Sequence, residues 1–303
     1  MLSVRKKCSQ IKQIAQIENK MEKLYVIKIG GNIIDDGVKL ASFLKEFAQL
    51  FASFSPSKGR GILVHGGGKL ATKVAEAMGI KQQMIDGRRI TDAETLKVVT
   101  MVYAGFINKN IVAQLQANNC NAIGLTGADG NVMLAHKRGS KALSFGEGLG
   151  EVDYGFVGDI DSVNAELLNN LLQQNIAVVL APITHNKEGQ LLNTNADTIA
   201  QETAKAMSKL YETELIYTFE KAGVLLDINN DSTVISTLTK AYYEELKSPL
   251  LEGEGAKIFA GMIPKLDNAF AAIESGVSKV IIGKSEELQQ LINGSAGTTI
   301  INQ

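Results

Sequence analysis

Short, mostly apolar runs alternate with longer amphipathic segments along most of this chain. The runs LYVIKI at 24–29 and GILVH at 61–65 are long enough for buried strands but too short for helices that cross a core. Between them, the leucines and phenylalanines of 37–52 recur three or four positions apart, which predicts a helix with one buried face. Parallel strands need such helical crossovers, so the alternation predicts an α/β protein whose mostly parallel sheet is covered on both faces.

The same patterns predict the remaining elements. Further buried strands are expected at 121–126, 176–183, 214–219 and 279–283. Further helices are expected at 69–79, 92–118 with an interruption at Gly105, 164–174, 195–208, 239–246 and 262–275. Shorter runs and many glycines between 131 and 160 predict hairpins that form a lid or flap. In sheets of this class a ligand binds beyond the carboxyl ends of the strands, so chemistry is expected there.

Composition excludes several classes of protein. The 303 residues include 31 basic and 32 acidic side chains, so there is no basic excess for a nucleic-acid partner. No apolar run reaches the roughly 20 residues of a membrane helix. The two cysteines and three histidines have no metal-ligand spacing. We therefore expect a cytoplasmic protein with no membrane partner and no metal site of its own.

Residues 1–23 form an N-terminal extension. Ile11, Ile14 and Ile17 recur at helical spacing, which allows an extra helix that packs on a partner subunit. The alternative is a floppy extension, since Met21 stands just before the first strand and could be the true start.

Two glycine turns follow the first two predicted strands. Gly30 and Gly31 allow a sharp turn whose N–H groups can approach an anion, and Lys28 interrupts the apolar strand just before them. This pair alone is a weak signal, because a snorkelling lysine beside two packing glycines explains it equally well. In VHGGGK, three glycines open a helix and leave N–H donors and the positive end of its dipole free. This second turn fits neither a Walker A loop nor GxGxxG, and His65 is interpreted as a core residue.

Three later segments contain polar or charged residues that are candidates for ligand binding. Arg88 and Arg89 precede the helix at 92, and an arginine fork matches a carboxylate, although usually only one of such a pair is functional. Asn193, Asn195 and Asp197 lead into the helix at 195, where Asn195 also suits a simple N-cap. Lys265 lies in the first turn of a helix, where a basic residue is unfavourable unless it meets an anion.

Together these features predict phosphoryl transfer. Two lysines, two glycine turns and an aspartate supply the donors and positive charge that this chemistry needs, since it depends mainly on positioning and charge neutralisation. No Ser/His/Asp or Cys/His arrangement competes with this interpretation.

The motifs resemble those of the amino acid kinase family, and within it the members that act on N-acetylglutamate. The resemblance runs from about Leu24 to Ile300, with these motifs in the family order: IKIGGN, VHGGGK, GRRITDAET, GLTGADGN, VDYGFVGDIDSVN, LLNTNAD and GMIPK. It implies an open three-layer αβα sandwich. Residues 24–175 would bind the acyl amino acid and pair into a homodimer, and residues 176–303 would bind ATP with Mg²⁺ on its phosphates.

The implied reaction transfers the γ-phosphoryl group of ATP to the side-chain carboxylate of N-acetyl-L-glutamate, giving N-acetylglutamyl 5-phosphate in the second step of arginine biosynthesis. By resemblance, Lys28 and Lys265 stabilise the transferring phosphoryl group and Asp197 holds both lysines. The resemblance also implies substrate-binding and nucleotide-binding positions. The substrate-binding ones are Gly67, Gly68, Arg89 (on the α-carboxylate) and Asn193, and the nucleotide-binding ones are Gly30, Gly31, Glu220, Lys221 and Gly223.

The chain departs from the family pattern in several places. After the strand at 214–219 the family usually has Thr/Ser-Asp-Val-Pro/Ser-Gly, whereas this chain has Phe-Glu-Lys-Ala-Gly at 219–223, so the adenosine contacts must differ in detail. The segment 283–297 is shorter than in arginine-sensitive relatives, and residues 1–23 lack the expected linker pattern, which predicts a dimer without strong arginine inhibition. Three alternatives stay open: N-succinyl-L-glutamate as acceptor, another kinase of the same family, and a catalytically silent binding protein with this fold.

Overall fold

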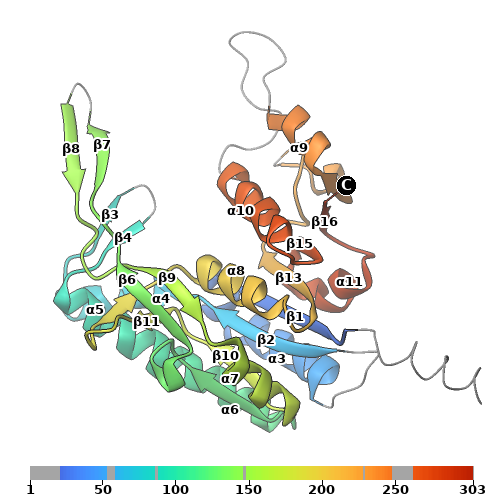
Figure 1. Cartoon of the computed structure of the whole chain (residues 1–303), viewed down its shortest axis with the longest axis horizontal. Coiled ribbons are helices and arrows are strands. Elements are labelled where there is room, and N and C mark those ends of the chain that lie inside the picture. The colour runs from blue at the N-terminus through green and yellow to red at the C-terminus, as the bar shows by residue number, and fades with distance from the viewer. Residues whose placement is uncertain are drawn as a thin grey trace, which may run out of the picture.

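The computed structural model describes residues 21–52, 59–85, 88–145, 148–227, 229–247 and 262–302. Most of the N-terminal extension lies outside these residues, so the expectations for its helix are not addressed. The predicted α/β class is confirmed: one large sheet runs through the molecule with helices on both sides (Figure 1).

The large sheet joins eight strands of the described part of the chain. In spatial order they are β14 (Thr237–Thr239), β16 (Thr298–Ile301), β15 (Lys279–Lys284), β13 (Glu212–Phe219), β1 (Lys23–Ile29), β2 (Arg60–His65), β10 (Ala177–Leu180) and β5 (Ala122–Leu125). From β15 to β5 every neighbour is parallel, as predicted, whereas β16 runs antiparallel to β15. The short strands β14 and β16 were not predicted, because runs of three or four residues rich in threonine give too little pattern.

Alternate residues of each central strand enter two different cores. In β1, Leu24 and Val26 belong to one apolar cluster, and Tyr25 and Ile27 belong to the other. This alternation is the period of two that a strand imposes on its side chains. It sandwiches the sheet between two helical layers, which gives the expected three-layer αβα arrangement.

The helices divide between the two faces. One face is covered by α3 (Gly37–Phe51), α4 (Gly68–Ala77), α5 (Ala93–Thr100), η1 (Met101–Ile107), α6 (Asn108–Ala117) and α11 (Leu288–Asn293). The other is covered by α7 (Ala165–Gln173), α8 (Ala196–Met207), α9 (Lys240–Lys247) and α10 (Ile263–Glu274). The predicted long helix at 92–118 is α5, η1 and α6 in succession, and its interruption around Gly105 is a π-helical segment, a form often found at functional sites.

Smaller sheets extend one side of the molecule. One contains β12 (Leu191–Asn193), β11 (Ile183–His185), β6 (Met133–Lys137) and β9 (Gly158–Val163), and two hairpins are β3 (Gln83–Ile85) with β4 (Arg88–Ile90) and β7 (Lys141–Phe145) with β8 (Gly148–Val152). The β7–β8 hairpin projects beyond the β3–β4 hairpin in Figure 1, which agrees with the predicted hairpins between 131 and 160. The strand expected at 176–183 instead ends at Leu180, because Pro182 lacks the N–H that a central strand donates, and β11 joins a different sheet.

The sheet order also bears on the expected division into lobes. Strands β10, β11 and β12 follow the expected boundary at 175/176, yet β10 lies between β2 and β5, and β11 pairs with β6. In space these strands therefore join the first lobe, and the division by residue number stays a prediction. Across the described residues, no helix combines the length and apolarity needed to cross a membrane.

Candidate active site

Lys28 faces the side of the sheet that is covered by α8 and α10. It follows Leu24 and Val26 at the strand period of two, so its side chain points the same way as theirs. It is 9% exposed, and its Nζ lies 2.8 Å from Oδ1 of Asp197 in the first turn of α8. A lysine this buried needs a charged partner, and Asp197 supplies it.

Asp197 is held in place by its own helix. Asn195 is the N-cap of α8, as the sequence allowed, and its side chain accepts a hydrogen bond of 2.7 Å from the Asp197 N–H. The Tyr217 hydroxyl donates to the backbone carbonyl of Asp197 at 3.3 Å. A carboxylate in the first turn is also stabilised by the helix dipole. Asp197 is therefore a fixed negative group against which a lysine can be oriented.

Lys265 approaches the same place from the first turn of α10. Its Nζ lies 3.9 Å from the centroid of the Phe219 ring, and the Nζ of Lys28 lies 5.7 Å from that centroid. Burial lowers the pKa of Lys265, Asp197 counteracts this, and the positive charge of Lys28 lowers it further. Two ammonium groups therefore share one carboxylate and one aromatic face, which leaves a local excess of positive charge suited to an anion.

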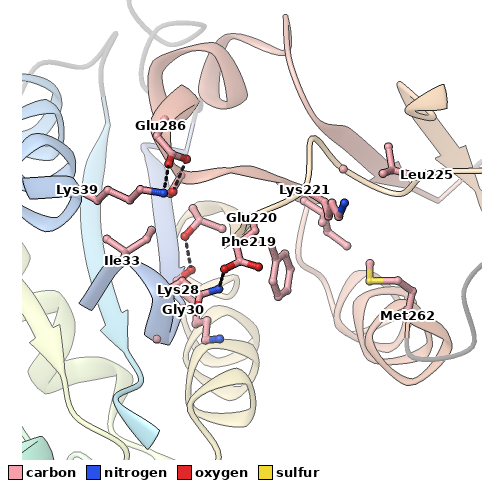
Figure 2. Close-up of a pocket in the computed structure, with 16 residues that line it drawn as sticks. Lys28, Gly30, Ile33, Lys39, Phe219, Glu220, Lys221, Leu225, Met262 and Glu286 are labelled. Atoms are coloured by element: carbon pink, nitrogen blue, oxygen red, sulfur yellow. Dashed lines mark hydrogen bonds and ion pairs between the residues drawn. The ribbon is translucent and has the colours of Figure 1, made fainter. Parts of the chain in front are cut away.

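A cavity of about 410 Å³ opens beside these groups. It is lined by Lys28, Gly30, Gly31, Asn32, Ile33, Lys39, Thr218, Phe219, Glu220, Lys221, Gly223, Leu225, Met262, Ile282, Ser285 and Glu286. All the residues predicted to bind nucleotide are in this set. Figure 2 shows Phe219 between Lys28 on one side and Met262 on the other. The size and the mixture of apolar walls with a few charged groups are typical of a small-molecule site.

The first glycine turn forms one wall of the cavity. Gly30 has an ordinary extended conformation (φ −82°) and precedes α2 (Gly31–Ile34). A Cβ added at Gly30 would lie 3.6 Å from its nearest neighbour, the carbonyl oxygen of Thr218, and one at Gly31 would lie 3.8 Å from Asp35. Both distances are normal contacts. Neither glycine is therefore required by the protein's own packing.

The second glycine turn lies next to the first. The Gly66 N–H donates to the Ile29 carbonyl at 3.3 Å, and Lys69 and Glu220 both hydrogen-bond to Asn32. Gly67 has a φ of 147°, and a Cβ there would lie 2.2 Å from Cδ1 of Ile107. Only glycine fits this position.

Arg89 and Asn193 lie on the other side of the second turn, as parts of β4 and β12. The Arg89 guanidinium donates to the Gly68 carbonyl at 3.1 Å and to Thr72 Oγ1 at 2.9 Å, and it also contacts Gln82. The Asn193 side chain donates to Thr91 Oγ1 at 3.0 Å. The structure thus brings Arg89 to the second turn and ties Asn193 to the segment that carries Arg89. The Arg88 side chain lies outside what the structure describes.

Several residues of the site were not predicted from sequence. Phe219 was noted only as a departure from a motif, yet it contacts both lysines. Asn32 links the two turns, and its place directly after Gly31 was the available signal. Lys39 and Glu286 form an ion pair of 3.2 Å across the cavity mouth (Figure 2). Because they belong to α3 and to the short helix η5 (Ser285–Glu287), no local sequence pattern connects them.

His65 is fully buried, which confirms its interpretation as a core residue, and burial lowers its pKa to about 4. Among the described residues no group of three His, Cys, Asp or Glu side chains could hold a metal ion.

Comparison with known proteins gives consistent matches over nearly the whole chain. Residues 23–284 match the model of the amino acid kinase family. The chain is 54% identical over 283 residues to an acetylglutamate kinase of Cytophaga hutchinsonii, covering 93% of this chain and 99% of that one. It is 38% identical over 263 residues to an acetylglutamate kinase of Methanopyrus kandleri, covering 87% and 96%.

Solved structures share the fold at low sequence identity. An N-acetylglutamate synthase from Neisseria gonorrhoeae, in complex with coenzyme A and N-acetyl-glutamate, matches with a TM-score of 0.71 at 20% identity, covering 94% of this chain and 61% of that one. A Giardia carbamate kinase matches with a TM-score of 0.63 at 14% identity, covering 94% and 100%.

Proposed function

The chain belongs to the amino acid kinase family, and we propose that it is an acetylglutamate kinase of arginine biosynthesis. It transfers the γ-phosphoryl group of ATP to the side-chain carboxylate of N-acetyl-L-glutamate and forms N-acetylglutamyl 5-phosphate. The relatives at about half identity support this substrate. The observation in the structure that carries the chemistry is the meeting of Lys28, Asp197 and Lys265 around Phe219, where Lys28 and Phe219 also line the cavity.

The reaction needs positive charge rather than a nucleophile from the protein. A carboxylate oxygen of the acceptor attacks the γ-phosphorus, the bond to the bridging oxygen breaks, and ADP leaves without any proton transfer. Negative charge on the transferring group is spread over its outer oxygens. Lys28 and Lys265 neutralise that charge, and Asp197 orients Lys28 through their ion pair of 2.8 Å.

The acceptor is proposed to lie against the second turn. The N–H groups of Gly67 and Gly68 at the start of α4 would donate to the carboxylate that is phosphorylated or to the phosphoryl group in transfer. Arg89 would bind the α-carboxylate in a bidentate manner, after releasing the Gly68 carbonyl and Thr72. Asn193 would hydrogen-bond the acyl amide.

ATP is proposed to occupy the cavity. Gly30 and Gly31 would admit its phosphates close to the main chain, and Glu220, Lys221 and Gly223 would border the nucleoside. Ile33, Leu225 and Met262 supply apolar walls for the base. Mg²⁺ would arrive on the phosphates, since Mg²⁺ in such sites is usually bound through substrate phosphates.

A homodimer formed through the first lobe is also proposed. Met101 and Phe106 are large apolar side chains on η1 that are 51% and 64% exposed, and their burial in an interface would remove apolar surface from water. Light scattering of the purified protein should give twice the mass of the chain, and a monomer at micromolar concentration would contradict the proposal.

The proposed reaction is tested by measuring ADP release together with trapping of the acyl phosphate by hydroxylamine. N-acetyl-L-glutamate, N-succinyl-L-glutamate and carbamate are compared at equal concentration with MgATP. We expect turnover with the acetyl compound above the other two. Lys265→Ala should lower kcat by about 10²–10³-fold, because a preorganised charge donor is lost.

The matched control is Lys97→Ala, which removes an exposed lysine whose ion pair is with Glu94, at 2.7 Å. It should leave kcat unchanged. Folded protein that releases no ADP with any acyl glutamate would refute the assignment, and preference for the succinyl compound would change the substrate while keeping the chemistry. Full turnover by Lys265→Ala would refute the role of Lys265.

A further inference from the structure

A buried polar chain lies directly behind the second glycine turn, and no step of the proposed reaction uses it. His65 on β2 and Asn108 at the start of α6 are 0% and 1% exposed. A buried imidazole and a buried amide cost free energy unless their polar atoms are hydrogen-bonded. The sequence predicted only that His65 lies in the core.

The neighbours of these two side chains fix every hydrogen-bond direction. The Gly66 carbonyl can only accept, and it lies 2.8 Å from His65 Nδ1, so Nδ1 carries the proton. Asn108 Nδ2 lies 3.1 Å from the Val179 carbonyl, and Asn108 Oδ1 lies 3.1 Å from Lys109 Nζ, so the amide has one consistent orientation. Its Nδ2 also lies 3.3 Å from His65 Nε2, which must then be the unprotonated nitrogen.

We infer that His65, held by Asn108, is a positioning residue that aims the Gly67 N–H at the reacting groups. The described residues contain no cis peptide bond, so the Gly67 N–H points opposite to the Gly66 carbonyl across the same peptide plane. The His65 Nδ1–H holds that carbonyl toward the core, which turns the Gly67 N–H away from it. Within the described residues, no backbone acceptor takes this N–H.

The residues packed around His65 and Asn108 leave space for the Asn108 side chain. A Cβ at Gly124, on the edge strand β5, would lie 1.9 Å from Asn108 Oδ1, so a side chain there would displace the amide. The residue before Asn108 is Ile107, the same residue that excludes any Cβ at Gly67. Glycine weakens a strand and often marks a close approach, which here is the approach of Asn108. At the junction of η1 and α6, two successive residues therefore pack at the second turn: Ile107 lies against Gly67, and Asn108 lies against His65.

This inference rests on the proposed function, because it gives the Gly67 N–H a part in the reaction. Its first test is independent of turnover: ¹⁵N NMR of the ring nitrogens in histidine-labelled protein, in which there are only three histidines to assign. We expect His65 to be neutral and protonated at Nδ1 from pH 5.5 to 8. A proton on Nε2 would overturn the inference, whatever reaction the protein catalyses.

The second test compares two substitutions of His65, each of which keeps one of its two hydrogen bonds, either to the Gly66 carbonyl or to Asn108. The amide nitrogen of His65→Asn takes the place of Nδ1 and can still donate to Gly66. In His65→Gln the amide oxygen takes the place of Nε2 and can accept from Asn108, but the side chain cannot donate to Gly66. We expect His65→Gln to lower kcat about tenfold or more with an unchanged KM for ATP, and His65→Asn to stay within about threefold of the wild type.

A role in packing alone gives the opposite order, because asparagine leaves the larger cavity. Turnover that falls more in His65→Asn than in His65→Gln, or that follows unfolding stability in both, would overturn the inference. His136→Gln is the matched control, since this histidine is exposed on β6, and its kcat should not change. If the wild type itself phosphorylates no acceptor, the proposed function fails, and the position of the His65 proton still decides the inference.

Discussion

The two glycine turns look alike in the sequence, but the structure gives their glycines different reasons to be glycine. At Gly67 the backbone conformation (φ 147°) and the contact with Ile107 both exclude any other residue, even in the empty protein. At Gly30 and Gly31 the backbone is ordinary and a Cβ would meet nothing closer than 3.6 Å. Gly67 is therefore glycine because of the protein's own conformation and packing, whereas Gly30 and Gly31, like Gly66 and Gly68 on either side of Gly67, are not required by packing and are free to serve a ligand.

This difference teaches that a glycine motif combines two constraints which the sequence does not separate. One acts on the folded protein and should appear in its stability. The other acts on the complex and should appear only in ligand affinity. Substituting one glycine in each turn distinguishes them, and the outcomes are given below from the largest expected effect to the smallest.

Gly67→Ala should have the largest effect. Strain at this φ and the contact of 2.2 Å with Ile107 Cδ1 should lower the free energy of unfolding by roughly 2–4 kcal/mol, and displacement of the turn should lower kcat by more than about 10²-fold. Urea unfolding and steady-state kinetics measure the two effects. The double variant Gly67→Ala with Ile107→Val lacks the clashing methyl group and should recover part of the stability. Wild-type stability of the single variant would remove the first half of the comparison.

Acid should destabilise the protein through the region of the second turn. His65 has a folded pKa of about 4 against an ordinary 6.5, so the unfolded chain binds the proton more strongly between these values. The contribution of neutral His65 to the free energy of unfolding is at its maximum above pH 6.5. It decreases as the pH drops toward 4, and at pH 4 the free energy of unfolding is lower by about 3 kcal/mol. Urea unfolding at pH 7.5 and pH 5 of wild type and His65→Gln isolates the contribution. An equal pH dependence in both proteins would contradict it.

Gly31→Ala should have the smallest effect, and only with ligand present. An added Cβ lies 3.8 Å from Asp35, so unfolding stability should stay within about 0.5 kcal/mol of the wild type. The same Cβ would stand where phosphates approach the main chain, so the KM for ATP should rise about tenfold. A stability loss above about 1 kcal/mol would mean that the first turn is also constrained by packing. An unchanged KM would place the phosphates elsewhere.

The charged centre formed by Lys28, Asp197 and Lys265 could be predicted from sequence because both lysines stand where a basic residue is unfavourable. Lys28 interrupts an apolar strand and Lys265 opens a helix with the wrong charge, so each calls for a partner on its own. The period of two along β1 even indicates which face Lys28 occupies. The strands and helices that were predicted correctly can also be identified from a single segment, because the whole apolar pattern of each lies within that segment.

What was missed depends on segments distant in sequence. The contact of Phe219 with both lysines, the bridge from Asn32 to Glu220 and the pair of Lys39 with Glu286 each join elements whose relative placement no local pattern fixes. The close approach of Ile107 to Gly67 also required the register of a π-helical segment, which periodicity at 3.6 residues per turn does not reveal.

The position of β1 has a consequence for how the protein is made. β1 is hydrogen-bonded between β2 and β13, and the Thr218 hydroxyl closes onto the Lys28 carbonyl across 190 positions of sequence. During synthesis, the edge of β1 that pairs with β13 therefore has no strand partner until β13 has left the ribosome. Contacts of such long sequence separation are slow to form, and an open edge can pair with other chains. The strand that carries Lys28 is thus synthesised nearly 190 residues before the strand that completes its pairing.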